Sequence, residues 1–386
     1  MSRTSGAVRQ APLEGVPPPR AVGRLVVDCA SQPDDAELRR LLAANPLGGQ
    51  ILLTLEREPD FFAAGTVEGD RRRTVVAREP STGRVVGLGT RSVSTVMVNG
   101  EPCRMGYLGQ LRVDSAYRGR PSLLAAGYDL LRAGRREDEI PFDLTTIIAD
   151  NQVARRLLES GVPRLPEYRA VEPFVTLVIP VRRQRSMQTS VERASEGRID
   201  EVSRCLERNR RRNQFAPIFS TEDLLSPERS RGLAPSDFLL YRSGGGIAGC
   251  LALWDQRSFK QVVVRGFGPR LLRWRPWLDL VSRARGGPRI PRPGETLPLA
   301  FISHLAVDGD DDGVFHQLLL AALAEARLRH IDYLVLGLAA RHPWLRRLRR
   351  AFRAWEYVSI IYTVSWERGR KMPFDGRMPH VEVAML

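Results

Sequence analysis

The chain has 386 residues, a formal net charge of +15 at neutral pH, and a composition that is 43% hydrophobic and 27% charged. This length predicts two or three domains, and the hydrophobic share is that of a globular protein. No apolar stretch approaches the ~20 residues needed to span a bilayer, and the polar first residues lack the apolar core of a signal peptide. The cysteines are too far apart to indicate a zinc site or a disulfide framework, which fits a reducing cytoplasm: Cys29, Cys103, Cys205 and Cys250.

The excess of positive charge comes almost entirely from arginine, because only Lys260 and Lys371 are lysine. Charge of this size is compatible with nucleic acid, an acidic membrane surface or an anionic cofactor as partner. A GC-rich genome would give the same arginine bias without any functional reason. The arginine clusters also have the character of a linker and of solvated helix faces, so nucleic acid is not the expected partner.

The first part of the chain is predicted to alternate strands and helices. Residues 1–21 are expected to form a disordered leader. Two turn sequences, 80–83 and Asn99-Gly100, predict antiparallel hairpins. The elements expected before residue 106 are strand 24–29, helix 34–44, an apolar stretch at 50–55, a loop at 56–62, and strands 73–79, 85–90 and 92–98.

The stretch 106–160 reads as strand, tight basic turn, helix, strand and helix. Pro121 suits the first helical position, because its fixed φ fits and its missing N–H would be unbonded there. A β-branched run is typical of a buried strand, and Asp150 and Asn151 can cap the helix that follows it. The expected elements are strand 106–113, turn 114–122, helix 123–131, strand 142–149, helix 152–160 and a closing strand 175–180.

The second part of the chain repeats this order after a basic linker at 181–187. A polar segment, 254–261, lies between apolar strands, and an inserted helix with two tryptophans is expected at 271–283. The other expected elements are strand 191–195, helix 199–210, strands 238–241, 247–254 and 262–264, a central strand 301–308, strand 357–366, and a final loop with room for one more strand at 381–385.

The two parts align as copies of one another. Residues 301–308 align without a gap on 107–114, and the helix and strand after them match those of the first copy. An internal repeat of this size is a strong organisational signal. It predicts separate domains at 22–182 and 189–386, joined near 181–188.

The order of elements in 106–160 resembles the core of the GNAT (Gcn5-related) N-acetyltransferases. In that family a turn of the form Gln/Arg-x-x-Gly-x-Gly/Ala opens a helix, and its backbone N–H groups hold the pyrophosphate of acetyl-CoA. Arg118-Gly119-Arg120 matches the start of this motif, whereas Pro121 and Leu123 stand where the two glycines would be. The resemblance implies an α/β (α+β) fold of two tandem GNAT-like domains, each a mixed, mostly antiparallel sheet flanked by helices.

The resemblance also implies an acyl-CoA site in the first copy, with acetyl-CoA or another acyl-CoA as co-substrate and no metal. The backbone N–H of a residue near Leu111 would hold the oxyanion, and pantetheine would pair with the strand around Arg112 and Val113. The alternative is an ordinary basic turn that caps a buried helix. The residues expected to contact the pyrophosphate are Arg118, Gly119, Arg120, Ser122 and Leu123.

The catalytic candidates are Tyr107, Gln110 and Asn151, which lie at or near the mouth of the predicted cleft. Many family members use a tyrosine as the acid that protonates the thiolate, and this chain has Leu158 at that position. Tyr107 can take that role, although a tyrosine in a central strand is more often a core residue. Asn151 is more often a helix cap than a catalyst.

The second copy is a poorer cofactor site. Its turn, 308–313, holds four aspartates, which would repel a pyrophosphate. The spacing lacks a full calcium loop, so an acidic helix N-terminus is the better interpretation. His304 and His342 can form a site or be satisfied core residues. The polar segment 254–261 can line a substrate groove or end a strand.

These features together favour a cytoplasmic CoA-dependent N-acyltransferase, most simply an acetyltransferase, that acts on a small-molecule or peptide amine. The first alternative is a non-catalytic tandem protein that binds a ligand or partner. The second is an aminoacyl-tRNA-dependent transferase of the Fem type, which also pairs two GNAT-like domains. The acceptor and the oligomeric state are not determined by the sequence.

Overall fold

The computed structural model describes residues 17–182, 190–352, 354–370 and 373–386. Residues 1–16 of the expected leader and most of the expected linker therefore lie outside the described residues, and residues 20–21 belong to a strand. The described elements of the first half are β1 (Arg20–Val22), β2 (Leu25–Cys29), α1 (Asp35–Ala43), β3 (Ile51–Glu56), α2 (Gly65–Glu68), β4 (Arg71–Arg78), β5 (Val85–Val98), β6 (Glu101–Val113), α3 (Pro121–Arg132), β7 (Glu139–Ile148), α4 (Gln152–Glu159) and β8 (Glu167–Pro180).

The second half has the same general order. One expectation for it was wrong: residues 383–385 form a short 3₁₀ helix, η6 (Val383–Met385), instead of a strand. Its other elements are β9 (Val191–Arg193), α5 (Ile199–Arg210), β10 (Asn213–Gln214), α6 (Thr221–Leu225), β11 (Phe238–Ser243), β12 (Gly246–Trp254), β13 (Gln261–Phe267), α7 (Pro269–Ala284), β14 (Leu299–Val307), α8 (Asp312–Leu328), β15 (Tyr333–Ala339), α9 (Trp344–Ala351), β16 (Trp355–Ser365) and β17 (Met378–Pro379).

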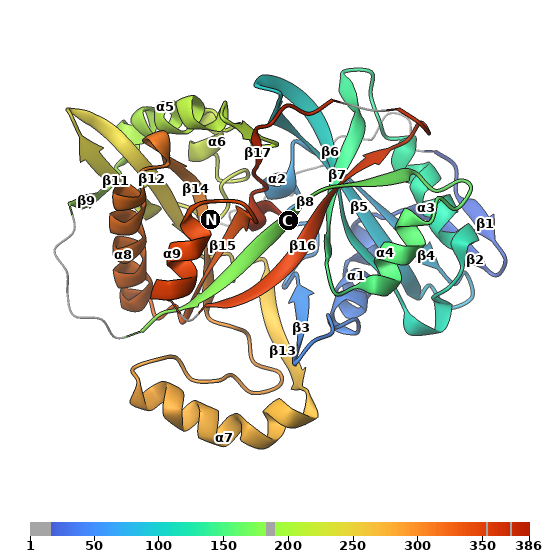
Figure 1. Ribbon diagram of the computed structural model, residues 1–386. Helices are drawn as coiled ribbons and strands as arrows, with labels where there is room; N and C mark the ends of the chain where they lie inside the picture. The colour runs from blue at the N-terminus through green and yellow to red at the C-terminus, as the bar shows by residue number, and fades with distance from the viewer. Residues whose placement is uncertain (1–16, 183–189, 353, 371–372) are drawn as a thin grey trace, which may run out of the picture.

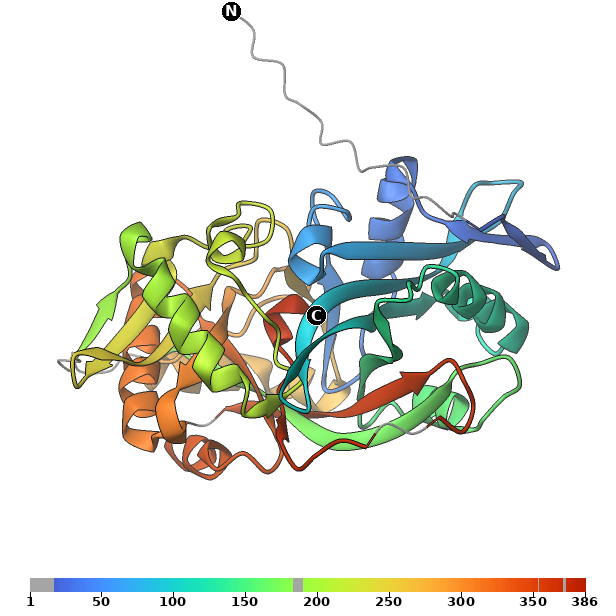
Figure 2. The ribbon, with the colours of Figure 1, turned by 90° about the horizontal axis from the view of Figure 1, so that it is seen from above.

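One mixed sheet of thirteen strands runs through both halves, in the order β1-β2-β4-β5-β6-β7-β16-β8-β15-β14-β12-β11-β9. Most neighbours are antiparallel, and the two parallel pairs are β6 with β7 and β14 with β15. Figures 1 and 2 show the sheet crossing the molecule with helices on its faces. The expected fold class, a mixed and mostly antiparallel α/β sheet flanked by helices, is confirmed.

The two halves exchange their last strands. β16, from the second half, lies between β7 and β8 and is antiparallel to both. β8, from the first half, pairs in turn with β15. A second link joins β3 to β13 in a two-stranded sheet. The expectation of two separate domains, without strands shared in one sheet, was therefore wrong.

Helices cover both faces of the sheet and enclose several apolar cores. α3 and α4 pack on one face of the first half, with Leu123, Leu130 and Leu158 buried beneath them, and α1 covers the other face. In the second half α8 and α9 cover one face and α5 the other. The sheet thus buries its apolar side chains against these helices, which is the main stabilising term of the fold.

Local sequence signals place the elements of the first copy as expected. Pro121 occupies the first turn of α3, and the Asn151 side chain caps α4 by accepting from the N–H of Ala154. Asn99 and Gly100 have positive φ in the β5–β6 turn, which suits a tight hairpin. Among the described helices, none is long and apolar enough to cross a membrane.

Candidate functional site

The central strand of the first half is bulged at the point where the sheet splits. Gln110 and Leu111 together lie opposite Gly89, because Gly109 pairs with Thr90 and Arg112 with Leu88. Such a bulge leaves one residue outside the hydrogen-bonded ladder and bends the strand. Gln110 has a φ of 53°, in the left-handed region that few non-glycine residues adopt.

Beside this bulge, β6 and β7 diverge. Their parallel pairing ends at Tyr107 and Leu144, although both strands continue for several residues. Leu111 follows the split and is 39% exposed. We call this splayed region between β6 and β7 the first opening. It places the backbone of 110–113 where a ligand can reach it, as expected for Leu111, Arg112 and Val113.

The turn after β6 presents free backbone donors at the start of α3. The N–H groups of Gly119, Arg120 and Ser122 donate to no described residue, whereas that of Leu123 donates to the Arg120 carbonyl at 3.1 Å. Gly119 has a φ of 75°, which glycine adopts readily. Free amides at a helix N-terminus, together with the helix dipole, favour an anion there.

The two arginines of this turn are exposed. Arg118 donates to the Val113 carbonyl and to Asn45 Oδ1, each at 3.2 Å, and Arg120 lies over the ring of Tyr117. Neither forms an ion pair with a described carboxylate. Leu123 is buried in the core under α3 and its N–H is already bonded, so it offers no free donor. The backbone N–H of Arg118 is also bonded, to the Ser115 carbonyl at 3.5 Å, so Arg118 would contact a phosphate through its side chain.

Tyr107 lies at the split, half-buried. Its Oη is 2.7 Å from Oγ1 of Thr146, on β7. Burial raises the pKa of Tyr107 to about 12, so its phenol stays protonated at neutral pH. A protonated phenol at this position can donate a proton or a hydrogen bond but cannot act as a base.

Gln110 points from the bulge into a buried charged cluster. Its Nε2 donates to Glu68 Oε1 at 3.2 Å, and its Oε1 is buried without a partner in the described structure. Glu68, at the end of α2, also pairs with Arg57 and with Arg72 Nε, the latter at 3.2 Å. Burial raises the pKa of Glu68, but the two guanidinium groups outweigh it and hold the pKa below its usual range.

The cluster continues through Lys260 to the end of the second half. Burial lowers the pKa of Lys260 to about 7, and burial raises that of Glu382 to about 7. Lys260 Nζ donates to the carbonyl of Ala384 at 3.3 Å. Two buried groups of opposite type thus titrate near neutral pH at the junction of the halves.

The second half has a matching bulge and split. His304 and Leu305 lie opposite Leu251, and His304 has a φ of 50°. The parallel pairing of β14 and β15 ends at Phe301 and Val335. We call the region between these strands the second opening.

The second opening is filled by residues 380–386, which we call the tail segment. The N–H of His304 donates to Glu382 Oε2 at 3.0 Å. On the facing strand, a Cβ at Gly337 would collide with the side chain of Val383. His304 is enclosed by aromatic rings, and a small cavity of roughly 30 Å³ borders it, His380 and Glu382.

The acidic turn of the second half is neutralised by the protein itself. Arg208 pairs with Asp308 at 2.8 Å, and Arg212 with Asp310 at 3.2 Å. Asp312 pairs with Arg347, and Asp311 Oδ1 accepts from the N–H of Val314 at 2.8 Å as the cap of α8. The acidic helix N-terminus favoured by the sequence is what the structure shows.

Several candidates have structural roles in the fold. The Asn151 carboxamide is the cap of α4. Leu158, at the position where many GNAT enzymes carry a catalytic tyrosine, is buried and offers no acid. His342 Nδ1 accepts from the N–H of Trp344. In the polar segment 254–261, Gln256 donates to the Ala384 carbonyl at 2.9 Å. Gln256 therefore contacts the tail segment.

Sequence reasoning missed most of the charged cluster. Arg57, Glu68 and Arg72 lie near one another in the chain but belong to no motif, and Lys260 and Glu382 are far from them in sequence. Because the chain has only two lysines, Lys260 could have been recognised as a candidate functional residue. The sequence indicated it only as a member of the polar segment 254–261. Among the described residues, no group of three or more His, Cys, Asp or Glu side chains could hold a metal ion.

A scan against protein-family profiles and a search of curated proteins found no match. Among solved structures, the chain is similar to N-myristoyltransferase of Saccharomyces cerevisiae with bound myristoyl-CoA, with a TM-score of 0.60, 13% identity, and coverage of 89% of this chain and 79% of that one. It is also similar to a GCN5-related N-acetyltransferase from Sphaerobacter thermophilus, with a TM-score of 0.54, 15% identity, and coverage of 92% and 99%. These likenesses show that the chain has a GNAT-like fold, as the stretch 106–160 implied.

Proposed function

We propose that this protein is a CoA-dependent N-acyltransferase that binds acyl-CoA in the first opening. The observation that carries the proposal is the combination of a bulged strand end with a following turn of free amides and arginines that pair with no described carboxylate. The GNAT-like fold supports it, because the similar solved structures are described as acyltransferases. Pyrophosphate would lie over Arg118, Gly119, Arg120 and Ser122.

In this reaction the main task of the protein is to place the amine and the thioester next to each other. An amine attacks the thioester carbonyl, and a backbone N–H near Leu111 holds the oxyanion. Tyr107 donates a proton to the leaving thiolate. Gln110, whose Nε2 donates to Glu68 Oε1, joins the opening to the buried charged cluster and acts as a positioning residue.

The acceptor in this proposal is a small-molecule or peptide amine, and the reaction takes place in the cytoplasm. The acyl group is acetyl in the simplest form of the proposal. One of the similar structures holds myristoyl-CoA, so longer chains belong in the test. A panel of CoA, acetyl-CoA, octanoyl-CoA and myristoyl-CoA, measured by thermal shift and calorimetry, identifies the acyl group, because a ligand of the folded state raises its stability.

Arg118→Glu is the critical variant. The Arg118 side chain is exposed, so its replacement leaves the fold intact, and each charge-assisted contact to phosphate contributes about 1.5–3 kcal/mol. We expect acyl-CoA affinity to fall at least tenfold. The matched control is Gly313→Ala in the turn of the second half, where an added Cβ meets only Asp311 Oδ1 at 3.1 Å.

Two results would contradict the proposal in different ways. Normal binding by Arg118→Glu, with loss of binding in Gly313→Ala or a His304 variant, would move the cofactor to the second half. No binding of any acyl-CoA at millimolar concentration would favour the non-catalytic tandem protein.

A further inference from the structure

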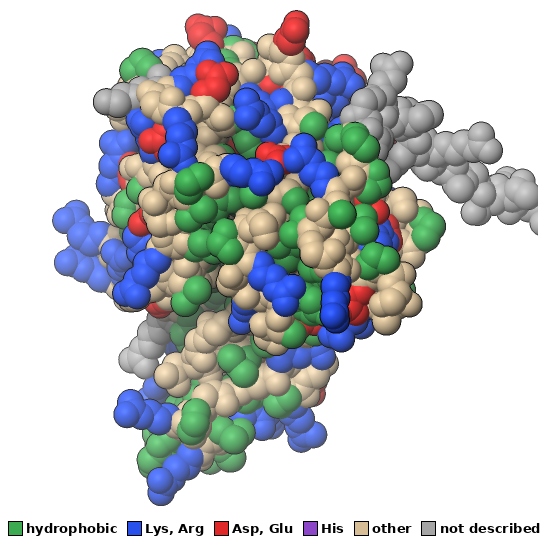
Figure 3. Space-filling model, turned by 90° about the vertical axis from the view of Figure 1, so that its right-hand side faces the viewer, with side chains coloured by type: hydrophobic (Ala, Val, Ile, Leu, Met, Phe, Trp, Pro, Cys, Tyr) green, Lys and Arg blue, Asp and Glu red, His purple; other side chains and the backbone are tan. Residues whose placement is uncertain are grey.

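Helix α7 projects from the body of the protein. It follows β13, and residues 285–298 lead the chain back to β14. Figures 1 and 3 show it as a separate arm at one end of the molecule, carrying both apolar and basic side chains. None of its sixteen residues is buried, so the helix contributes no side chain to the core.

Large apolar side chains on α7 are exposed to solvent. Leu272 is 58% exposed, Trp274 and Trp277 are each 59% exposed, and Leu280 is 65% exposed. Leu272 and Leu280 lie on other sides of the helix, whereas Trp274 and Trp277 share one side with Leu271 and Leu278. Isolated exposed leucines are normal, but an exposed apolar surface with two tryptophans marks an interaction site.

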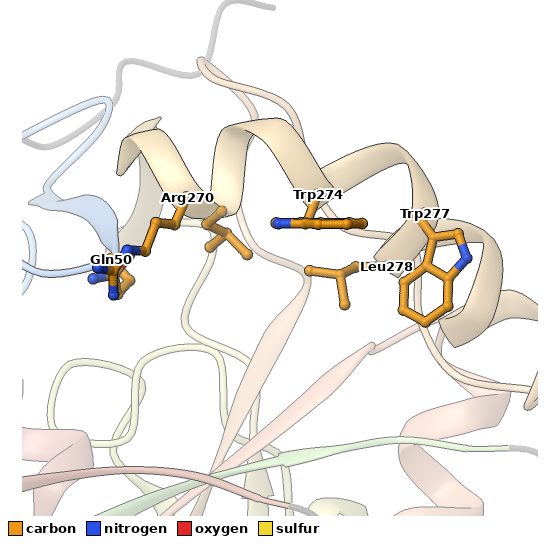
Figure 4. A pocket seen from close by; sticks show the side chains of 6 residues that line it. Gln50, Arg270, Trp274, Trp277 and Leu278 are labelled. Atoms are coloured by element: carbon orange, nitrogen blue, oxygen red, sulfur yellow. The ribbon is translucent and has the colours of Figure 1, made fainter.

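One side of α7 is covered by the loop that follows it. Residues 286–292 pack there: Arg275 donates to the Ile290 carbonyl at 3.1 Å, and the N–H of Ile290 donates to Asp279 Oδ1 at 2.7 Å. On another side Trp274, Trp277 and Leu278 project together into a hollow of about 340 Å³, with Arg270 and Gln50 at its end (Figure 4).

The helix is also strongly basic. It contains four arginines and one aspartate, a net charge of +3. Asp279 is paired with Arg283 at 2.5 Å, whereas Arg270 and Arg273 form no ion pair in the described part of the chain. The partner of this surface must therefore offer negative charge and apolar contact together.

We propose that α7 docks on the surface of an anionic lipid bilayer, lying in the interface with its tryptophans and leucines among the headgroups and upper acyl chains. Tryptophan is enriched at the membrane–water interface, where its amphipathic ring lies at the level of the headgroups, and α7 exposes two tryptophans beside basic residues. Anionic lipid attracts arginines such as Arg270 and Arg273. A nucleic acid would leave Leu272, Leu280 and the two tryptophans in water, which makes it the poorer match.

The test uses the full chain and sedimentation with vesicles of phosphatidylcholine, alone or mixed three to one with phosphatidylglycerol. We expect binding to the mixed vesicles, little binding to phosphatidylcholine alone, and loss of binding at high salt, which screens surface charge. Trp274→Ser/Trp277→Ser and Arg270→Glu/Arg273→Glu should each weaken binding at least tenfold. The midpoint of urea unfolding serves as the folding control for both variants, because all four side chains are exposed.

Two matched controls test for general effects of surface change. Val153→Ser removes an apolar side chain that is 82% exposed on α4, and Arg211→Glu reverses an exposed charge at the end of α5. Neither should change vesicle binding.

Four results would overturn the proposal. The first is no binding to either vesicle. The second is equal binding of the wild type and both α7 variants. The third is a dimer in light scattering that Trp274→Ser/Trp277→Ser abolishes, without vesicle binding, which would make the face a contact between two copies. Binding of an oligonucleotide in place of vesicles would likewise assign the surface to nucleic acid.

Discussion

The two openings of the sheet share one backbone design and differ in what occupies them. Each begins where a parallel pair of strands splits, and each has a bulge with a left-handed residue, Gln110 in the first and His304 in the second. The first is followed by exposed arginines and free amides. The second is followed by aspartates that the protein neutralises with its own arginines, and the tail segment fills it.

This difference shows that the bulged split belongs to the fold and does not by itself make a binding site. The strand ladders match Leu144 with Val335, so Thr146 of the first opening corresponds to Gly337 of the second. Thr146 bonds to Tyr107, whereas Gly337 has no side chain because Val383 occupies that space. The first opening has arginines without a described carboxylate partner and free amides beside it, and the second uses its space for internal packing.

The largest effect is expected from Glu68→Gln, at the junction between the openings. This change leaves Arg57 and Arg72 buried without their carboxylate, and breaking a buried ion pair costs about 3–5 kcal/mol. We expect a loss of stability of that size in urea unfolding. The matched control is Asp70→Asn. The Asp70 side chain is 36% exposed in its ion pairs with Arg104 and Arg229, so the change should alter stability by less than about 1 kcal/mol. Equal effects of the two variants would mean that the cluster is hydrated and not a buried ion pair.

A smaller effect separates the two openings directly. Gly337→Val inserts a branched side chain against Val383 and against Phe174, whose Cε1 lies 2.6 Å from the position of a Cβ. Overpacking of this kind costs about 1–3 kcal/mol and should release the tail segment to limited proteolysis. Thr146→Val keeps the shape of the first opening and removes only the bond to Tyr107, at a cost of about 1 kcal/mol. If Gly337→Val were as mild as Thr146→Val, the tail segment would not be packed in the second opening.

A further effect is a pH dependence. The pKa of Lys260 falls from 10.5 to about 7 on folding, so between these values the unfolded chain binds the extra proton. The free energy of unfolding should therefore rise with pH from about 7 to 10.5, by at most about 1.4 kcal/mol per pH unit. Lys260→Met should flatten this rise.

Glu382 gives the opposite sign and the matched control. Its pKa rises from 4.5 to about 7, so the folded chain binds the extra proton between these values and stability falls as pH rises through them. Glu382→Gln should remove that fall and leave the rise above pH 7. An unchanged profile in both variants would show that the two groups are solvated in the folded protein.

Much of the local structure was predictable from the sequence, because its causes are local. Pro121 begins α3, Asn99 and Gly100 form the β5–β6 turn, and the apolar runs became buried strands. The internal repeat predicted that the second half would copy the first. The contrast between a basic turn at Arg118 and an acidic turn at Asp308 could also be predicted, since the sign of a charge requires no coordinates.

The tertiary structure decided which distant segments meet. An apolar strand such as β16 can pair with any suitable edge, so nothing within it indicated that it would lie between β7 and β8. The sequence of the tail segment is compatible with a strand. In the folded chain it packs into the space between β14 and β15, beside Gly337, and residues 383–385 form a 3₁₀ helix. The cluster of Arg57, Glu68 and Lys260 joins residues about two hundred positions apart, and their pKa values follow from shared burial, which is a property of the folded chain and not of any one segment.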